Sequence, residues 1–292
     1  MAGTNAALFT LVVAGFGSAF ALGSVAVSAV PPVWVASIRA GVGCAIFLGL
    51  VTATGRRIGV APRDLAVYAL VRATTGAVPF FLLAWGQQSV PSSLAGVLFT
   101  PVPLMTVFLS WGAFGGPRPS VLRASAAALG LAGVAVAFPE AGAVGTAQLA
   151  GAAAILAAAV SYAVGGLILQ RMGAYDPFAL MAGQFALVAV VLTVAAGAAA
   201  PTPAFTAHLL AALALGATGS ALPLICFLML LRRTDAVIAS SVTFFIPFVA
   251  VGLGIALLGE APTRSLFLGF VICAAGSALV LRPNHRQPET AP

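Results

Sequence analysis

Long apolar segments separated by short polar breaks run along the whole chain. Each holds about 20 residues, the length an α-helix needs to cross a bilayer. Because lipid cannot hydrogen-bond the backbone, such segments must be helices or strands of a closed barrel, and the alternating pattern of barrel strands is absent. The pattern therefore predicts an all-α integral membrane protein. Its ten expected transmembrane helices span about residues 6–27, 33–54, 66–88, 92–114, 121–138, 147–170, 177–199, 207–231, 237–258 and 265–282.

One stretch of this pattern occurs twice. The segment 79–103, PFFLLAWGQQSVPSSLAGVLFTPVP, recurs at 223–247 as PLICFLMLLRRTDAVIASSVTFFIP, with prolines at both outer ends. A constant offset of 144 carries the match over residues 77–115 without a gap, and seven of the 39 pairs are identical. About four identities are expected by chance, so the shared register of prolines is the stronger evidence. It predicts two copies of one unit, residues 6–138 and 147–282, facing each other around a site.

Five spans in each copy is an odd number, so the second copy must enter the membrane in the opposite direction. We therefore expect two inverted five-helix repeats. The second span of each copy supports the alignment, because PVWVASIRAGVGCAIFLGLV from Pro32 resembles PFALMAGQFALVAVVLTVAA from Pro177. This comparison pairs Arg39 with Gln184, two polar residues at matching places.

Composition agrees with a membrane protein, and the charges indicate its topology. Of the residues, 61% are hydrophobic and 7% are charged, against roughly 25% charge in soluble domains. All 13 basic residues are arginines, and they gather at span ends, so the net charge of +7 reflects topology rather than nucleic-acid binding. With both termini in the cytoplasm, only Arg264 lies outside. The cytoplasmic arginines are Arg56, Arg57, Arg63, Arg118, Arg123, Arg171, Arg232, Arg233, Arg282 and Arg286.

Three details complete this topology. Arg39 and Arg72 lie within spans, and we expect Arg72 at the interface near the cytoplasmic end of the third span. Residues 283–292 are polar and contain proline, which predicts a disordered cytoplasmic tail. The first apolar segment has no basic region before it and is too long for a signal-peptide core, so we interpret it as a retained span.

The chain resembles a known family. Ten spans in two inverted halves, a proline seven residues before Arg39, and the LLGE sequence that ends at Glu260 resemble the EamA-type drug/metabolite transporters over about residues 6–282. The first copy departs from this pattern, with Gly-Gly at 115–116. The length and the aromatic third span are most similar to amino-acid exporters of the YddG type. The resemblance implies a bacterial-type inner membrane and export of small metabolites, above all aromatic or apolar amino acids, by alternating access through a central cavity.

Aromatic and amide side chains mark one face of the third helix. Phe81, Trp85 and Gln88 are spaced i, i+4 and i+7, so they share a face that could line a cavity. The alternative is that such aromatic residues pack internally or face lipid, although the Trp85 indole N–H needs a partner away from lipid. The resemblance implies further aromatic cavity residues on other spans. The matching candidates are Phe20, Phe99 and Tyr162.

The same face in the second copy consists of Ile225, Met229 and Arg232. Met229 would give the substrate site a wall that adapts to varied apolar side chains. Thr243 is a further candidate for substrate binding, as one of several span hydroxyls. These hydroxyls could bind an ammonium or carboxylate group, or bond to helix carbonyls and bridge helices instead. The others in the set are Ser161, Ser240 and Ser241.

Prolines and one arginine are the structural candidates. Pro79 and Pro223 are equivalent in the two copies, and because proline removes a backbone hydrogen bond they are candidate hinges, with static kinks as the alternative. Arg39 is either a carboxylate anchor or a structural clamp, and its presence in the family pattern across different substrates favours the clamp. Small residues at four-residue spacing indicate close packing of the first and last spans. They are Gly15, Ala19, Gly23, Gly269, Cys273 and Ser277.

Several function classes lack the residues they need. The chain contains no lysine, so no Walker sequence exists and ATP is not the energy source. No acidic residue or histidine lies in mid-membrane, and there is no HExxH or GxSxG motif, which argues against an enzyme and against a proton relay. Cys44, Cys226 and Cys273 lack metal-ligand spacing and are expected to pack in apolar runs. We expect no cofactor and no metal.

Secondary transport remains, with downhill export favoured. The expected partners are a small-molecule substrate and membrane lipid, and the chain is expected to be a monomer or weak oligomer. Two alternatives stay open. One is broad efflux of drugs or other metabolites, since an aromatic cavity also suits flat apolar compounds. The other is a membrane scaffold or sensor that moves no solute. A channel would need a polar pore ring, which these spans lack.

Overall fold

The structure is a computed structural model that describes residues 2–56, 64–137, 145–172, 175–234, 242–261 and 263–280. All regular elements within these ranges are helices, so the predicted all-α class is confirmed for this part of the chain. The predicted tail lies outside it. The helices are α1 (Ala2–Val27), α2 (Pro32–Ala53), α3 (Leu65–Arg72), η2 (Ala73–Ala77), α4 (Val78–Gly86), α5 (Ser92–Phe99), α6 (Val102–Phe114), α7 (Val121–Ala137), α8 (Thr146–Leu169), α9 (Pro177–Ala199), α10 (Ala207–Gly216), η3 (Ala217–Ala221), α11 (Leu222–Leu231), α13 (Val242–Leu258) and α14 (Arg264–Val280).

Seven segments of the described part are long and apolar enough to cross a membrane. Three shorter apolar helices occupy the places of the fifth, ninth and tenth predicted spans, at Val121–Ala137, Phe245–Leu258 and Arg264–Gly276. The count of ten crossings stays a prediction, because these three fall short of the usual length. The seven long segments are Gly3–Val27, Pro32–Ala53, Leu65–Gly86, Ser92–Phe114, Thr146–Leu169, Pro177–Ala199 and Ala207–Leu231.

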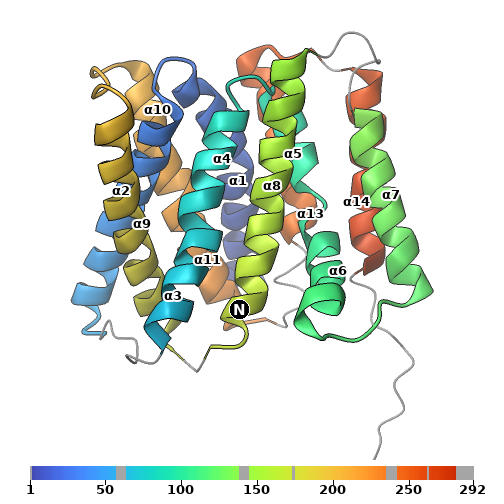
Figure 1. The fold of residues 1–292 in the computed structure, drawn as a ribbon, viewed down its shortest axis with the longest axis horizontal. Coiled ribbons are helices and arrows are strands. Elements are labelled where there is room, and N and C mark those ends of the chain that lie inside the picture. Colours follow the sequence, from blue (N-terminus) through green and yellow to red (C-terminus); the bar gives the residue numbers. More distant parts are fainter. Residues whose placement is uncertain are drawn as a thin grey trace, which may run out of the picture.

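Helices that correspond in the two predicted copies pack against each other. α2 lies along α9, and α7 lies along α14; Figure 1 shows these pairs at opposite edges of the bundle. The second pair is in backbone contact, because a Cβ added to Gly133 would lie 2.6 Å from the Cys273 nitrogen. On the other side of the bundle, a Cβ on Gly15 would lie 2.8 Å from the Pro223 ring. The predicted close packing through small residues is confirmed at these positions.

The 144-residue offset recurs in the backbone. The π-helices η2 and η3 begin 144 residues apart, and each precedes a proline, Pro79 or Pro223. Gly115 and Gly259, also 144 apart, have φ angles of 67° and 66°, which favour glycine. Proline lacks an N–H and crowds the carbonyl four residues earlier, and a π-turn relieves both problems. The repeated geometry therefore has a local cause in the repeated prolines.

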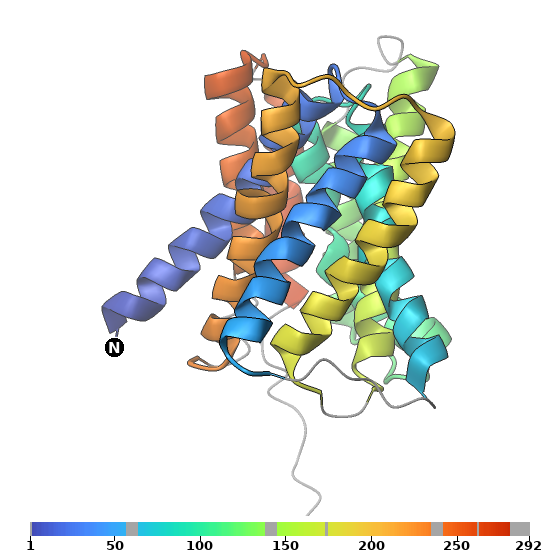
Figure 2. The same cartoon turned by 90° about the vertical axis from the view of Figure 1, so that its left-hand side faces the viewer.

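The first helices of the two predicted copies run in opposite directions. Figure 2 shows α1 rising from the lower left, where the amino terminus lies, and Figure 1 shows α8 descending toward that same end of the bundle. Several basic side chains lie at this end, among them Arg56 after α2, Arg171 after α8 and Arg232 after α11. We call it the arginine-rich end.

Candidate functional site

The third apolar segment buries an aromatic and amide face that lies one residue before the predicted one. Phe80 and Gln87 are buried at 5% and 8% exposure, whereas Phe81 and Trp85 are 36% and 40% exposed and Gln88 is exposed. Phe80 and Gln87 each lie one residue before a residue of the same type, Phe81 and Gln88. The spacing of aromatic and amide residues alone therefore could not show which face is buried. Contact of Phe81, Trp85 and Gln88 with a substrate stays a prediction, and the buried face positions the central residues.

Three of the predicted aromatic residues come together. The Phe99 ring of α5 lies 5.9 Å from Phe20 of α1 and 5.6 Å from Tyr162 of α8, the latter pair edge to face. Gln87 holds α1 in place, because its Nε2 donates to the Phe20 carbonyl at 2.6 Å. We call Phe20, Phe80, Phe99, Tyr162 and the neighbouring Arg39 the central cluster.

Arg39 joins helices of both predicted copies. Its Nε donates to Ser220 Oγ in η3 at 2.7 Å, and its guanidinium lies 4.1 Å from the Phe80 ring centre. These contacts fit the structural clamp, since one side chain of α2 connects η3 and α4. A role as carboxylate anchor stays a prediction.

Arg72 was expected at the membrane interface, and this is wrong. Its side chain has no exposed area, and it is the largest wholly buried side chain in the described residues. Nη1 donates to Gln184 Oε1 of α9, and the Tyr68 ring lies 4.3 Å away. Nη2 and Nε have no hydrogen-bond partner within the described ranges. The expectation failed because the residues that cover Arg72 come from α9 and from the preceding turn of α3.

Gln184 also bonds to the π-helix of the other copy. Its Nε2 donates to the Thr75 carbonyl at 3.1 Å. Thr75 lies four residues before Pro79, whose missing N–H leaves that carbonyl without its usual helical partner. Gln184 and Arg39 are the two residues that the repeat alignment pairs, and each reaches from its own copy to the π-helix of the other.

A cavity of about 300 Å³ opens at the arginine-rich end between α2, α9 and α11. The predicted face Ile225, Met229 and Arg232 lies on its wall, which has an apolar part and a basic rim. Ile225 and Met229 also pack against the hydrophobic cluster that contains Phe80 and Tyr162. We call this the arginine-rimmed cavity. Its lining residues are Leu50, Thr54, Arg56, Phe178, Ile225, Met229, Arg232 and Arg233.

Asp176 organises the rim of this cavity. It caps α9 by accepting the N–H groups of Phe178 and Ala179 at 3.0 Å each, pairs with Arg56, and lies 3.7 Å from Arg232. Burial raises the pKa of its carboxyl, but the two N–H groups and Arg56 outweigh burial, so its pKa is lowered. Among the described residues this one carboxylate meets two guanidinium groups, and Arg233 adds a third to the cavity lining, which leaves the rim positive.

The candidate hydroxyl residues differ in what the structure shows for them. Ser161 Oγ donates to the Thr74 carbonyl at 2.8 Å, so Ser161 bridges α8 and η2, as the structural alternative expected. Thr243 is exposed in the first turn of α13, and its role in binding stays a prediction. Ser240 and Ser241 lie outside the described residues. Hinge motion at Pro79 and Pro223 also stays a prediction.

Glu260 has a structural role that the sequence did not reveal. Its carboxylate accepts the N–H groups of Ser92 and Ser93 at 2.6 and 2.9 Å, and so caps α5 from the end of α13. A serine pair after Pro91 marks a helix start, but nothing local indicates a distant carboxylate as its cap. Gly116, at the equivalent position, carries no carboxylate, so this contact belongs to Glu260 alone of the two.

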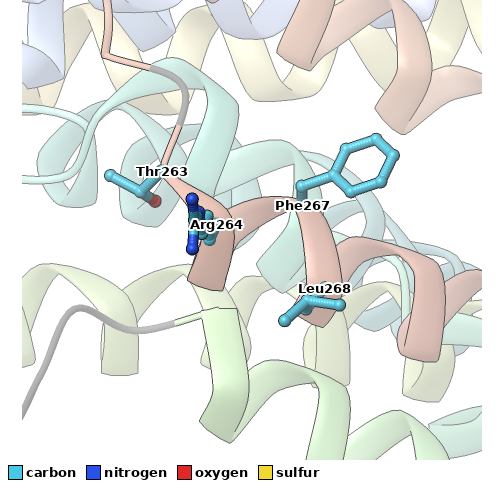
Figure 3. A pocket seen from close by; sticks show the side chains of 4 residues that line it. All are labelled: Thr263, Arg264, Phe267 and Leu268. Atoms are coloured by element: carbon cyan, nitrogen blue, oxygen red, sulfur yellow. The ribbon is translucent and has the colours of Figure 1, made fainter.

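A second hollow of about 390 Å³ lies at the start of α14, lined by Thr263, Arg264, Phe267 and Leu268. Figure 3 shows the side chains of Thr263 and Phe267 pointing apart. Phe267 and Leu268 are more than half exposed. Because its wall is largely exposed and offers only Thr263 and Arg264 as polar side chains, we do not take this hollow as a candidate site.

Comparison with known proteins gives concordant results. The model of the EamA-like transporter family matches residues 4–138 and again 149–282. A probable terminal-alkyne amino-acid exporter of Streptantibioticus cattleyicolor is 27% identical over 75% of this chain and 74% of its own length. The uncharacterized inner membrane transporter YedA of Escherichia coli K12 is 29% identical over 92% of this chain and 88% of its own. A solved crystal structure superposes with a TM-score of 0.69 at 20% identity, covering 95% and 96% of the two chains, which shows a shared fold.

Proposed function

The chain belongs to the EamA-like transporter family, and from this premise we propose that it is a secondary exporter of amino acids with apolar or aromatic side chains. It is a multi-pass membrane protein, and a relative named as a probable amino-acid exporter supports the substrate class. YedA, named as an inner membrane transporter, supports the inner membrane as its location.

The observation that carries the proposal is the arginine-rimmed cavity. Its rim offers guanidinium groups to a carboxylate, and its wall offers Ile225 and Met229 to an apolar side chain. An amino acid with an apolar side chain carries both features. An organic cation would meet the repulsion of Arg56, Arg232 and Arg233, so the cavity disfavours the alternative of broad cationic drug efflux.

We place the arginine-rich end in the cytoplasm, by the rule that arginines gather on that side, so solute would enter from inside the cell. Inverted repeats and alternating access belong to this proposal. The opposite directions of α1 and α8 and the recurrence of η2 and η3 support them. Downhill export is the proposed energetics, because the described carboxylates Asp64, Asp176 and Glu260 lie outside helix centres.

The test is counterflow into proteoliposomes with phenylalanine, leucine, glutamate and an organic cation. We expect exchange of phenylalanine and leucine. Met229→Trp places an indole in a cavity of about 300 Å³, so it should lower phenylalanine uptake by about tenfold. Leu222→Trp is the matched control, because Leu222 is 48% exposed on the same helix. Exchange of the cation alone would support broad efflux, and no exchange of any solute would favour the scaffold alternative.

A further inference from the structure

The unpartnered donors of Arg72 lie on one edge of its guanidinium group. In arginine, Nη1 lies on the side of Cδ, while the N–H bonds of Nε and Nη2 point the other way and run parallel. Gln184 occupies Nη1, and Nε and Nη2 are the two atoms without partners in the described part of the chain. This edge matches the two oxygens of a carboxylate, which accepts both N–H groups side by side.

The charge of Arg72 is uncompensated as well. Its neighbours include the Gln184 amide and Tyr68, whose ring and hydroxyl both lie near the guanidinium group, and neither carries a formal charge. The ion pairs found among the described residues all involve Asp176 at the arginine-rich end. A buried guanidinium without a counter-charge is unfavourable, and two unmade hydrogen bonds add to that cost. A carboxylate would remove both penalties at once.

Arg72 is linked through Gln184 to a helix that packs against both the cavity and the central cluster. Its partner Gln184 precedes Phe185, whose ring packs 6.0 Å from Phe80. Ile225 and Met229 of the arginine-rimmed cavity pack against the same hydrophobic cluster. Along its helix, Arg72 precedes Phe80 by about two turns on the buried face.

We propose that Arg72 is a second carboxylate subsite, separate from the rim of the arginine-rimmed cavity, and that it binds the carboxylate group of the solute through Nε and Nη2 once the solute has left that rim. The identity of the solute rests on the proposed function, whereas the carboxylate chemistry rests on the geometry of Arg72. The second copy has Gly216 at the equivalent position, so the first copy alone supplies this subsite. Because Arg72 is fully covered in this conformation, the segment around α3 must open for the carboxylate to enter.

The experiment measures binding to purified full-length protein by the concentration dependence of thermal stabilisation. Three probes separate the chemical groups: phenylalanine, phenylalaninamide without a carboxylate, and 3-phenylpropionate without an ammonium group. We expect phenylalanine and 3-phenylpropionate to bind and the amide to bind much more weakly. Arg72→Gln should weaken both carboxylates by about 10- to 100-fold and leave the amide unchanged. Arg72→Lys keeps the charge but lacks two parallel N–H groups. Its affinity for the two carboxylates should lie between those of the wild type and Arg72→Gln.

Arg171→Gln is the matched control, since Arg171 donates to the Phe114 carbonyl at the arginine-rich end and should not affect the preference. If Arg72→Gln does not fold, Arg72→Lys decides, and an unchanged preference for carboxylates overturns the proposal. Arg72-dependent binding of 3-phenylpropionate without amino-acid counterflow would refute the proposed substrate but support the subsite. Amino-acid counterflow together with an unchanged preference for carboxylates in both Arg72 variants would refute the subsite but support the proposed substrate.

Discussion

Two cross-links connect the copies of this protein, and they use the same backbone with different chemistry. In one, Arg39 of α2 donates to Ser220 of η3; in the other, Gln184 of α9 donates to the Thr75 carbonyl of η2. The two π-helices are equivalent by the 144-residue offset. The proline that follows each of them explains why this geometry persists, because the constraint lies in the backbone.

The side chains differ between the two cross-links, and the positively charged residue lies on a different helix in each. At η3 the cation is Arg39 on α2, opposite a hydroxyl, and it is only partly buried. At η2 the cation is Arg72 on the third segment itself, opposite an amide, and it is wholly buried. Arg39 therefore links the two copies through its Nε, whereas Nε and Nη2 of Arg72 have no partner among the described residues. The two π-helices therefore share a backbone geometry and differ in the side chains that they bond.

The largest expected effect comes from removing the amide of Gln184. Gln184→Leu leaves Nη1 of Arg72 and the Thr75 carbonyl without partners, and should destabilise the protein by about 3 kcal/mol. Gln184→Glu is the matched comparison, because its carboxylate pairs with Arg72 and should recover part of that loss while weakening carboxylate binding. Denaturation midpoints in detergent measure both. A Leu variant as stable as the wild type would show that this cross-link contributes nothing.

A smaller effect is expected from exchanging Gly76 and Ser220, which are equivalent residues of η2 and η3. A Cβ on Gly76 would lie 2.6 Å from Val188 Cγ2, so Gly76→Ser should cost about 1–3 kcal/mol through overpacking. Ser220→Gly removes the acceptor of Arg39 and should cost about 1 kcal/mol. The same unfolding measurement ranks them. Equal losses of stability in the two variants would mean that η2 and η3 are packed alike, which would contradict the difference between the two cross-links.

The sequence contained the repeat but not the partners of its polar residues. Prolines in register predicted two equivalent hairpins. The π-helices η2 and η3, which precede these prolines at the same offset, were not predicted. The sequence could not show that Phe80 is buried and Phe81 is partly exposed, since both are aromatic and only packing decides between them. The burial of Arg72 depends on Gln184, 112 positions away. Contacts between copies decide such features, and no local pattern encodes them.

The smallest expected effect is at Asp176, and it tests whether the difference between the cross-links arises inside the bundle. Asp176 joins α2 to α9, the helices that carry Arg39 and Gln184, so loosening it should affect both cross-links equally. Its pKa is lowered in the folded protein, so its stabilising contribution is complete above about pH 4 and is lost as the pH falls through the folded pKa. Because the pair is about one-third exposed, water screens it, and Asp176→Asn should cost about 1 kcal/mol at most at neutral pH. Double variants that combine Asp176→Asn with Gln184→Leu or with Ser220→Gly, compared with the single variants at pH 7, measure the coupling. Stronger coupling to one cross-link would place the source of the asymmetry at the arginine-rich end instead.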